Sequence, residues 1–168
     1  MARYNYPTST KRTYKFVQHK KYFIITIIFI ILDQLSKLYF SINFSLGESI
    51  PIFNWLNFTY LHNYGAAFSI GSEYPISRYI LPIISIVASI FIVILMLKSK
   101  AANILKLSAL SLILAGAFGN FIDRAFFGYV IDFVDINIDL WDYRFAIFNL
   151  ADSFISVGVV LLLFSKDD

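Results

Sequence analysis

Four long apolar stretches restrict the fold of this chain more than any other feature of its sequence. Because an α-helix rises 1.5 Å per residue, about 20 apolar residues cross a hydrocarbon core about 30 Å thick. The stretches predict transmembrane helices at about residues 21–40, 79–97, 104–123 and 145–164. With 58% hydrophobic and 15% charged residues, the chain has too little charge for the surface of a soluble domain. We therefore predict a single membrane-embedded domain over residues 1–168.

The N-terminal end is compatible with two interpretations. Residues 1–21 contain basic and no acidic side chains, and residues 22–32 are apolar, a pattern that also opens secretory signal peptides. However, the apolar run leads directly into Asp33 and Lys37 without a small-residue cleavage site, and three further apolar stretches follow. We therefore interpret it as a retained transmembrane helix. Residues 1–20 are expected to be a basic cytoplasmic tail, either an anchor on anionic lipid or, as we favour, disordered.

The distribution of basic residues predicts the orientation of the helices. Lysines and arginines gather in the N-terminal tail, between Lys98 and Lys106, and at Lys166. Basic loops stay on the cytoplasmic side of a membrane, so we expect both termini there. Segments 41–78 and 125–144 are then expected on the outer face.

The first outer segment carries signals for strands and for a polar turn. Residues Ile52–His62 alternate and are rich in aromatic side chains, which predicts short strands at the membrane surface. Asn63 opens the run Asn63-Tyr-Gly-Ala-Ala-Phe68, whose small residues suit the close approach of another backbone. Taken alone, Asn63 is better interpreted as an ordinary turn residue.

Two groups of polar residues interrupt the third and fourth helices in the same leaflet. Asn120, Asp123 and Arg124 lie at positions i, i+3 and i+4 and share one helix face. Asn149 and Asp152, at i and i+3, are expected within the first two turns of the fourth helix. Ionisable residues inside a membrane indicate functional sites. The alternative is that Asp123 and Arg124 merely pair with each other at the lipid boundary.

Asp132 lies between these two groups in the second outer segment. The residues around it are mostly apolar, which is not typical of a charge that only increases solubility. Asp135, Asp139 and Asp142 have more polar neighbours, and we expect them at the surface.

Other residues are expected to hold the helices together. Asp33 and Lys37 lie at positions i and i+4 of the first helix, and we favour an ion pair that orients this helix over a direct chemical role. Gly116 and Gly119 lie near the polar face of the third helix, so that another backbone can come close there.

Two carboxylates in a site of low dielectric constant cannot both be ionised at little cost, so one of them retains a proton. Such a pair can add water to an amide, because the ionised partner deprotonates water while the protonated partner polarises the carbonyl group. We predict that Asp132 and Asp152 form this pair. The residues expected to orient the substrate or the carboxylates are Asn120, Arg124 and Asn149.

Other catalytic chemistries lack suitable residues. The two histidines, His19 and His62, have no metal-ligand spacing to another candidate, and the chain has no cysteine. A serine nucleophile would need a histidine base, and neither histidine is placed for this role. We expect no metal site.

Five motifs occur in order: Asp33-Gln-Leu-Ser-Lys37, Asn63-Tyr-Gly-Ala-Ala-Phe68, Gly119-Asn-Phe-Ile-Asp-Arg124, Val130-Ile-Asp-Phe133 and Phe148-Asn-Leu-Ala-Asp152. Over about residues 22–164, this series resembles the bacterial lipoprotein signal peptidases, the signal peptidase II family. The resemblance implies an intramembrane aspartic endopeptidase that removes the signal peptide of diacylglyceryl-modified prolipoproteins just before the lipidated cysteine. It implies a catalytic dyad of Asp132 and Asp152. The residues that it implies around the dyad are Asn63, Asn120, Asp123, Arg124 and Asn149.

The resemblance also completes the predicted architecture. We expect an all-α integral membrane protein with four transmembrane helices, a small extracytoplasmic β-rich cradle from residues 41–78, and a short, lid-like interfacial helix within Ala125–Arg144. The resemblance implies the bacterial cytoplasmic (inner) membrane, lipidated prolipoprotein substrates and membrane lipids as partners, and binding of the cyclic-peptide inhibitor globomycin between the two aspartates. No cofactor and no nucleic-acid partner are expected.

Two other classes of protein also place polar residues in a membrane. A proton-coupled transporter would use paired aspartates as a relay, but the inner halves of the third and fourth helices offer only hydroxyl groups such as those of Ser108, Ser111 and Ser156. A non-catalytic assembly factor would use polar groups to hold helices together. That function does not explain why both polar groups and Asp132 converge on one leaflet, so we favour the peptidase.

Overall fold

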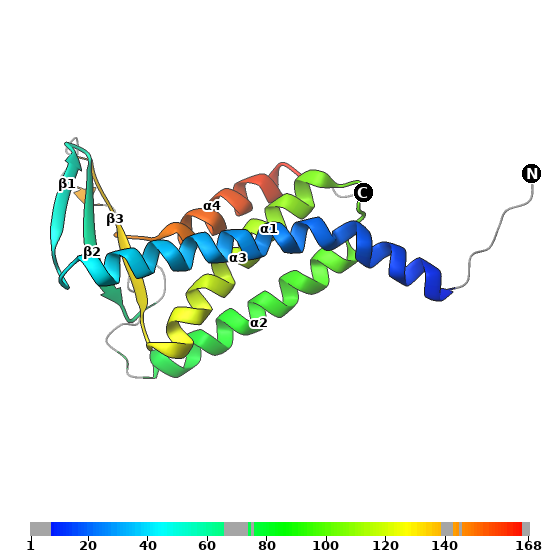
Figure 1. Cartoon of the computed structure of the whole chain (residues 1–168), viewed down its shortest axis with the longest axis horizontal. Helices are drawn as coiled ribbons and strands as arrows, with labels where there is room; N and C mark the ends of the chain where they lie inside the picture. Colours follow the sequence, from blue (N-terminus) through cyan, green and yellow to red (C-terminus); the bar gives the residue numbers. More distant parts are fainter. Residues whose placement is uncertain (1–7, 66–73, 75, 139–142, 145, 166–168) are drawn as a thin grey trace, which may run out of the picture.

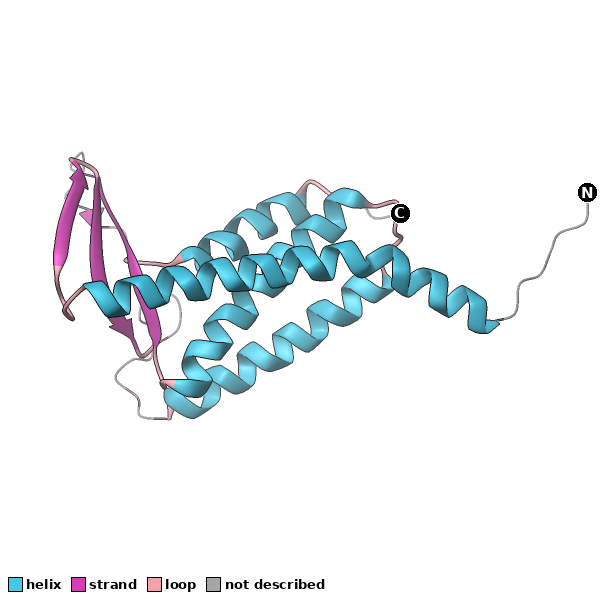
Figure 2. Cartoon of the chain, in the orientation of Figure 1, coloured by secondary structure: helices cyan, strands magenta, loops and turns pink. Residues whose placement is uncertain are grey.

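The computed structural model describes residues 8–65, 74, 76–138, 143, 144 and 146–165. Within them, the helices lie along one another and a small sheet covers one end of the bundle (Figures 1 and 2). In chain order the elements are α1 (Thr8–Asn43), β1 (Ser49–Phe53), β2 (Leu56–Asn63), α2 (Ser77–Lys98), α3 (Ile104–Phe126), β3 (Val130–Ile138), β4 (Tyr143–Arg144) and α4 (Leu150–Leu163).

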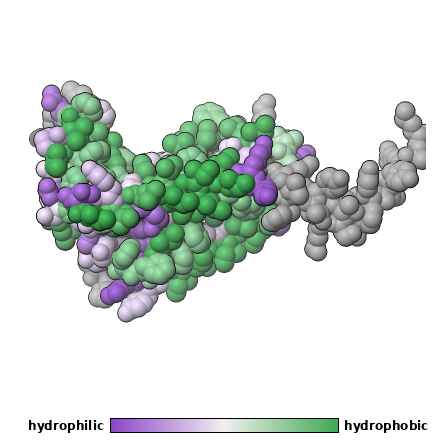
Figure 3. Space-filling model, in the orientation of Figure 1, coloured by the Kyte–Doolittle hydropathy of each residue, from purple (hydrophilic) through white to green (hydrophobic). Residues whose placement is uncertain are grey.

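The helices have the length and the surface of membrane-spanning elements. Among the described residues, three segments are long and apolar enough to cross a bilayer: His19–Asn43, Ser77–Lys98 and Ile104–Phe126. The described α4 is shorter, at 14 residues. Apolar side chains cover much of the bundle surface (Figure 3), and Ile27, Ile83 and Val160 are each more than half exposed. Such a surface is compatible with lipid around the helices.

The N-terminal prediction of a disordered tail is wrong for residues 8–20. These residues continue α1, which begins at Thr8. The stretch contains neither glycine nor proline, so no residue within it interrupts a helix that is already formed by the apolar residues that follow.

The lid-like helix predicted within Ala125–Arg144 is also wrong for the described residues 127–138, 143 and 144. After α3 ends at Phe126, the chain forms β3 and then β4. The sequence of β3, VIDFVDINI, is rich in β-branched and aromatic residues, which favour a strand. The strands form one antiparallel sheet in the order β1-β2-β3-β4, so the fold is not all-α. The strands predicted within Ile52–His62 correspond to β1 and β2.

The sheet is attached to the helices by a buried aromatic cluster. Phe40 from α1, Tyr60 from β2, and Ile131 and Phe133 from β3 pack together, and the rings of Phe40 and Phe133 stack with their centroids 4.1 Å apart. Successive side chains of a strand project from opposite faces. The packing of Ile131 and Phe133 on α1 therefore directs Asp132 to the opposite face of the sheet.

Gly116 allows α4 to approach α3 closely, as the sequence predicted. A Cβ atom at this position would collide with the backbone oxygen of Ala151 and lie 2.6 Å from Ile155 Cγ1. We therefore expect Gly116→Val to destabilise the fold by about 1–3 kcal/mol through overpacking, measured as a lower midpoint of thermal unfolding in detergent. Ala125→Val adds volume on the exposed side of α3 and should change the midpoint little. An equal decrease in both variants would contradict this account.

Candidate active site

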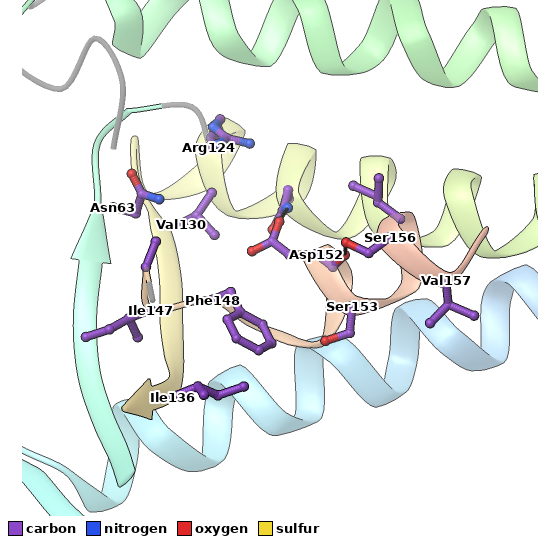
Figure 4. Close-up of a pocket in the computed structure, with 13 residues that line it drawn as sticks. Asn63, Arg124, Val130, Ile136, Ile147, Phe148, Asp152, Ser153, Ser156 and Val157 are labelled. Carbon is purple, nitrogen blue, oxygen red and sulfur yellow. Dashed lines mark hydrogen bonds between the residues drawn. The ribbon is translucent and has the colours of Figure 1, made fainter. Parts of the chain in front are cut away.

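A cavity of about 530 Å³ lies where the sheet meets α3 and α4 (Figure 4). Its volume is in the range of about 300–1,000 Å³ that is usual for ligand-binding pockets. Asp152 from α4 and Asn63 from β2 both contribute to its wall. Among the described residues, those that line it are Asn63, Asn120, Arg124, Val130, Ile136, Ala146, Ile147, Phe148, Asp152, Ser153, Ile155, Ser156 and Val157.

Asp152 lies in the first turn of α4, and Asn149 caps this helix. Asp152 N donates to Asn149 Oδ1 (3.0 Å), and Asn149 N donates to Asp152 Oδ2 (3.3 Å). The helix begins at Leu150 and not at about residue 145, because Phe148 pairs with β3. Asn149 therefore lies before the helix, and not within its first two turns as predicted.

Asp132 projects from β3 towards the same region and is 3% exposed. Its Oδ1 accepts a hydrogen bond from Asn149 Nδ2 (2.6 Å), and its Oδ2 accepts one from Asn63 Nδ2 (3.0 Å). Asn149 thus connects Asp132 to the start of the helix that carries Asp152. Asn63, on the other side of the Asp132 carboxylate, lines the cavity.

The surroundings of Asp132 favour its protonated form. Burial, and after it the negative charge of Asp152, raise the pKa of Asp132 to about 7. The hydrogen bonds from Asn63 and Asn149 and the charge of Lys37 act in the opposite direction. Near neutral pH, Asp132 is therefore poised between a proton donor and an acceptor, as a general acid must be.

Asn120 connects Asp152 to a charged group deeper in the bundle. Its Oδ1 accepts hydrogen bonds from Lys37 Nζ (3.0 Å) and Asn149 Nδ2 (3.3 Å), and its Nδ2 donates to Asp152 Oδ1 (2.8 Å). A lysine ammonium group can only donate, so Asn120 must present its oxygen to Lys37. Its amide nitrogen is consequently directed at the Asp152 carboxylate.

Lys37 is the centre of a buried ionic cluster. Its Nζ lies 2.9 Å from Asp33 Oδ2 and 3.0 Å from Asp123 Oδ2, and all three side chains are at most 2% exposed. Asp33 Oδ1 accepts a hydrogen bond from Ala151 N (2.9 Å), and Asp123 Oδ2 accepts one from Ile131 N (3.2 Å). The cluster therefore connects α1 and α3 to α4 and β3 next to both Asp132 and Asp152.

Asp123 and Arg124 do not pair with each other. Asp123 binds Lys37, whereas Arg124 Nη2 donates to the backbone oxygen of Gly65 (3.0 Å) and the side chain lines the cavity. Gly65 N also donates to Asn63 Oδ1 (2.9 Å). Asn63 is therefore both a turn residue and a hydrogen-bond donor to the site, so the two interpretations of this residue are compatible.

Sequence reasoning missed or misplaced several residues near the site. Gln34 Nε2 donates to Asp123 Oδ1 (3.0 Å). Gln34 lies in one of the five motifs, but its sequence context predicts no role for it. Asp135, expected at the surface, is fully buried and accepts a hydrogen bond from Thr59 Oγ1 (2.8 Å). The alternation of β3 places Asp135 on the face opposite Asp132, but it does not reveal that both faces of the strand are buried. Asp139 and Asp142 lie outside the described residues.

The described side chains form no group of three or more histidines, cysteines, aspartates or glutamates that could hold a metal ion. The carboxylates of Asp33 and Asp123 already share the ammonium group of Lys37. The asparagine side chains hold the buried carboxyl groups in fixed orientations beside a cavity in the membrane. Fold and site together define an integral membrane protein with an acidic site at one end of its helices.

Comparison with known proteins shows the family. The model of signal peptidase (SPase) II matches residues 25–166, so the chain belongs to the signal peptidase II family, and the resemblance seen in its motifs is confirmed. The lipoprotein signal peptidase of Coxiella burnetii (strain RSA 493 / Nine Mile phase I) is 45% identical over 139 residues, which cover 82% of this chain and 84% of that protein. That of Buchnera aphidicola subsp. Acyrthosiphon pisum (strain Tuc7) is 38% identical over 155 residues, which cover 91% and 96%.

Two solved structures have the same fold. A bacterial membrane enzyme determined by the in meso method at 2.3 Å resolution superimposes with a TM-score of 0.77 at 36% identity, covering 86% of this chain and 85% of that one. Another, at 1.9 Å resolution, gives a TM-score of 0.75 at 36% identity, covering 86% and 90%.

Proposed function

We propose that this protein is an intramembrane aspartic endopeptidase. It cleaves the signal peptide from diacylglyceryl-modified prolipoproteins immediately before the lipidated cysteine, and Asp132 and Asp152 activate the water. The observation that carries the proposal is the connection of two carboxylates from separate elements, β3 and α4, through Asn149 next to a cavity lined by Asp152. Membership of the signal peptidase II family supports the same reaction.

The hydrogen bonds assign different roles to the two aspartates. Asp152 accepts hydrogen bonds at both oxygens, from Asn120 Nδ2 and Asn149 N, which fix the orientation of this carboxylate as the base. Asp132, whose pKa is raised to about 7, supplies the proton. Asp152 takes a proton from water as the water oxygen attacks the scissile carbonyl carbon, and Asp132 protonates the carbonyl oxygen. The resulting diol collapses when Asp152 returns its proton to the leaving nitrogen and Asp132 recovers its own from a hydroxyl group.

The neighbouring residues orient the reacting groups. Asn120 and Asn149 fix the carboxylates, and Asn63 and Arg124 present donor groups at the cavity wall to the substrate backbone. Asp123 holds Lys37 and, through Ile131 N, the start of β3. Apolar residues of α4 and of the segment before it continue the cavity along the helix, where they suit an apolar signal peptide. Globomycin is expected to bind between the two aspartates.

The orientation in the membrane follows the basic residues. We place four spans in the bacterial cytoplasmic membrane, with both termini cytoplasmic and the site near the outer leaflet. Towards the opposite end of the bundle, Tyr22, Ile92, Met96, Leu107, Leu110 and Leu114 form an apolar core cluster. This cluster supports a peptidase more than a transporter, because a proton relay would need a chain of polar groups through it, whereas the buried hydroxyl groups beside it, of Thr26 and Ser111, donate to backbone oxygens.

The rate of cleavage is expected to decrease as the pH rises above about 7. Asp132 must carry a proton to act as the acid, and its protonated fraction falls as the pH passes its pKa of about 7. The hydrogen bond from Asn63 lowers this pKa, so Asn63→Ala should raise it and move the decrease in rate to higher pH. Cleavage rates measured from about pH 5 to about pH 9, a range that extends about two units to either side of this pKa, test the predicted pH dependence. Asn63→Ser keeps a donor and should move the profile less, whereas a shift to lower pH in Asn63→Ala would contradict the role of Asp132.

One experiment tests the proposed function directly. Purified protein in detergent is incubated with a diacylglyceryl-modified prolipoprotein and with the same precursor lacking the lipid, and the products are identified by mass spectrometry. Cleavage of the lipidated precursor alone, immediately before the modified cysteine, is the expected result. Equal cleavage of both precursors would contradict the lipid requirement, and cleavage of neither would contradict the function.

A further inference from the structure

A second cavity, of about 460 Å³, is lined by Tyr64, Tyr74, Arg78, Tyr79, Phe127, Gly128 and Tyr129. It lies where α2 begins and α3 ends, and among the described residues it has no lining residue in common with the active-site cavity. The two cavities are nevertheless adjacent along the chain. Asn63 and Val130, which pair in the sheet, line the first, and the next residues, Tyr64 and Tyr129, line the second.

The aromatic wall of the second cavity is held in place by ring contacts. Tyr129 stacks on His62 with the ring centroids 3.7 Å apart, and Tyr64 meets Tyr129 edge-on at 5.5 Å. Phe127 lies on the same side, with its ring 6.0 Å from that of Tyr129. Tyr64, and Tyr79 from the start of α2, are 52% and 69% exposed, so their hydroxyl groups are available to a ligand.

Arg78 brings a positive charge into this aromatic setting. A Cβ atom on Gly128 would lie 2.6 Å from Arg78 Nε, so the guanidinium group lies directly against the Gly128 backbone. The backbone of Gly128, with φ at +81°, is also one that other residues rarely adopt. An exposed guanidinium group beside tyrosine hydroxyl groups suits a phosphate, which it can bind through two parallel hydrogen bonds.

The position of the cavity favours a lipid as the source of that phosphate. With the orientation proposed above, the start of α2 lies at the depth of the outer headgroups, where tyrosine rings also settle. Below Arg78, Leu81 and Pro82 follow at positions i+3 and i+4 of the same helix face and are partly exposed, and the neighbouring Ile83 and Ile84 are 61% and 56% exposed. A ligand bound at Arg78 therefore has a continuous apolar surface beside it for acyl chains.

We propose that the second cavity binds the headgroup of an anionic phospholipid from the outer leaflet. Arg78 binds the phosphate, the tyrosines contact the rest of the headgroup, and the acyl chains lie along the exposed isoleucines of α2. Because Tyr64 follows Asn63 directly, the bound lipid stabilises the strand ends that form one wall of the active-site cavity. The site is separate from the catalytic residues, so the proposal does not depend on the proposed peptidase reaction.

Native mass spectrometry of the full-length protein tests this proposal. The protein in detergent is mixed with dioleoylphosphatidylglycerol, with dioleoylglycerol, which has the same chains and no phosphate, or with inorganic phosphate. The wild type is expected to retain one phosphatidylglycerol and neither of the other two. Arg78→Gln should weaken this binding about tenfold or more, since a charged hydrogen-bond partner is lost, and Arg78→Lys should have a smaller effect.

Lys98→Gln is the matched control, because it neutralises an exposed cation at the opposite end of α2. It should leave phosphatidylglycerol binding unchanged. Equal binding by the wild type and Arg78→Gln, an equal loss in Lys98→Gln, or equal retention of dioleoylglycerol would overturn the proposal. Retention of inorganic phosphate alone would also overturn it in favour of a site for a soluble anion. The readout is bound mass, so a failure of peptidase activity leaves the result interpretable.

Discussion

Asp152→Asn is expected to lower the rate of prolipoprotein cleavage by a factor of about 10² to 10⁴, the usual contribution of a positioned acid or base. The amide cannot take a proton from water. Moreover, both oxygens of Asp152 accept hydrogen bonds, from Asn120 Nδ2 and Asn149 N. In the asparagine variant the NH₂ group would face one of these two donors, so one hydrogen bond would be lost. Asp132→Asn should cause a loss of similar size, because it removes the acid. Turnover of a lipidated precursor by each purified variant is the measurement.

Asp135→Asn provides a matched control for this experiment. Asp135 is a fully buried aspartate on the same strand as Asp132, but it lies on the opposite face and binds Thr59. An asparagine can still accept the hydrogen bond from Thr59, so cleavage should remain close to that of the wild type. Near-normal turnover by Asp152→Asn would exclude it as the base. An equal loss in Asp135→Asn would indicate that any buried aspartate of the sheet is needed for folding.

The parts of the fold that depend on helix length and helix spacing could be predicted from the sequence. Apolar length placed α2 and α3 to within a few residues, because lipid requires long apolar helices. The spacing of Asn120 and Asp123 predicted one polar face, and both side chains are buried towards the other helices. Gly116 predicted a close helix approach, since only a missing side chain permits it.

The parts that depend on strand register and on partners distant in the chain could not be predicted. The position of Asp135 depends on which face of β3 packs on Phe40 of α1, and neighbouring residues do not reveal this. Asn149 looked like an internal helix residue, because its role as a cap depends on where Phe148 stops pairing with β3. Lys37 has an obvious partner four residues away, but its second partner, Asp123, is brought to it only by the packing of α3 on α1.

Lys37→Met is expected to destabilise the protein by about 3–5 kcal/mol and to reduce cleavage further than the loss of folded protein explains. The stability is lost because Asp33 and Asp123 are left as buried carboxylates without a cation, at 0% and 1% exposure. The activity is lost because Lys37 Nζ no longer donates to Asn120 Oδ1. The amide group of Asn120 can then rotate, so that its nitrogen turns away from Asp152. Thermal unfolding and cleavage rates on the folded fraction measure the two effects separately.

A triple variant separates charge balance from orientation. In Lys37→Met combined with Asp33→Asn and Asp123→Asn, the uncompensated charges are gone, so at least half of the lost stability should return. The asparagine at position 33 can still accept the hydrogen bond from Ala151 N, which keeps the start of α4 in place. Cleavage should nevertheless stay low, because the triple variant does not restore the donor that orients Asn120. A triple variant that cleaves at the wild-type rate would show that Lys37 only balances charge, and a stable Lys37→Met variant would contradict the need for that balance.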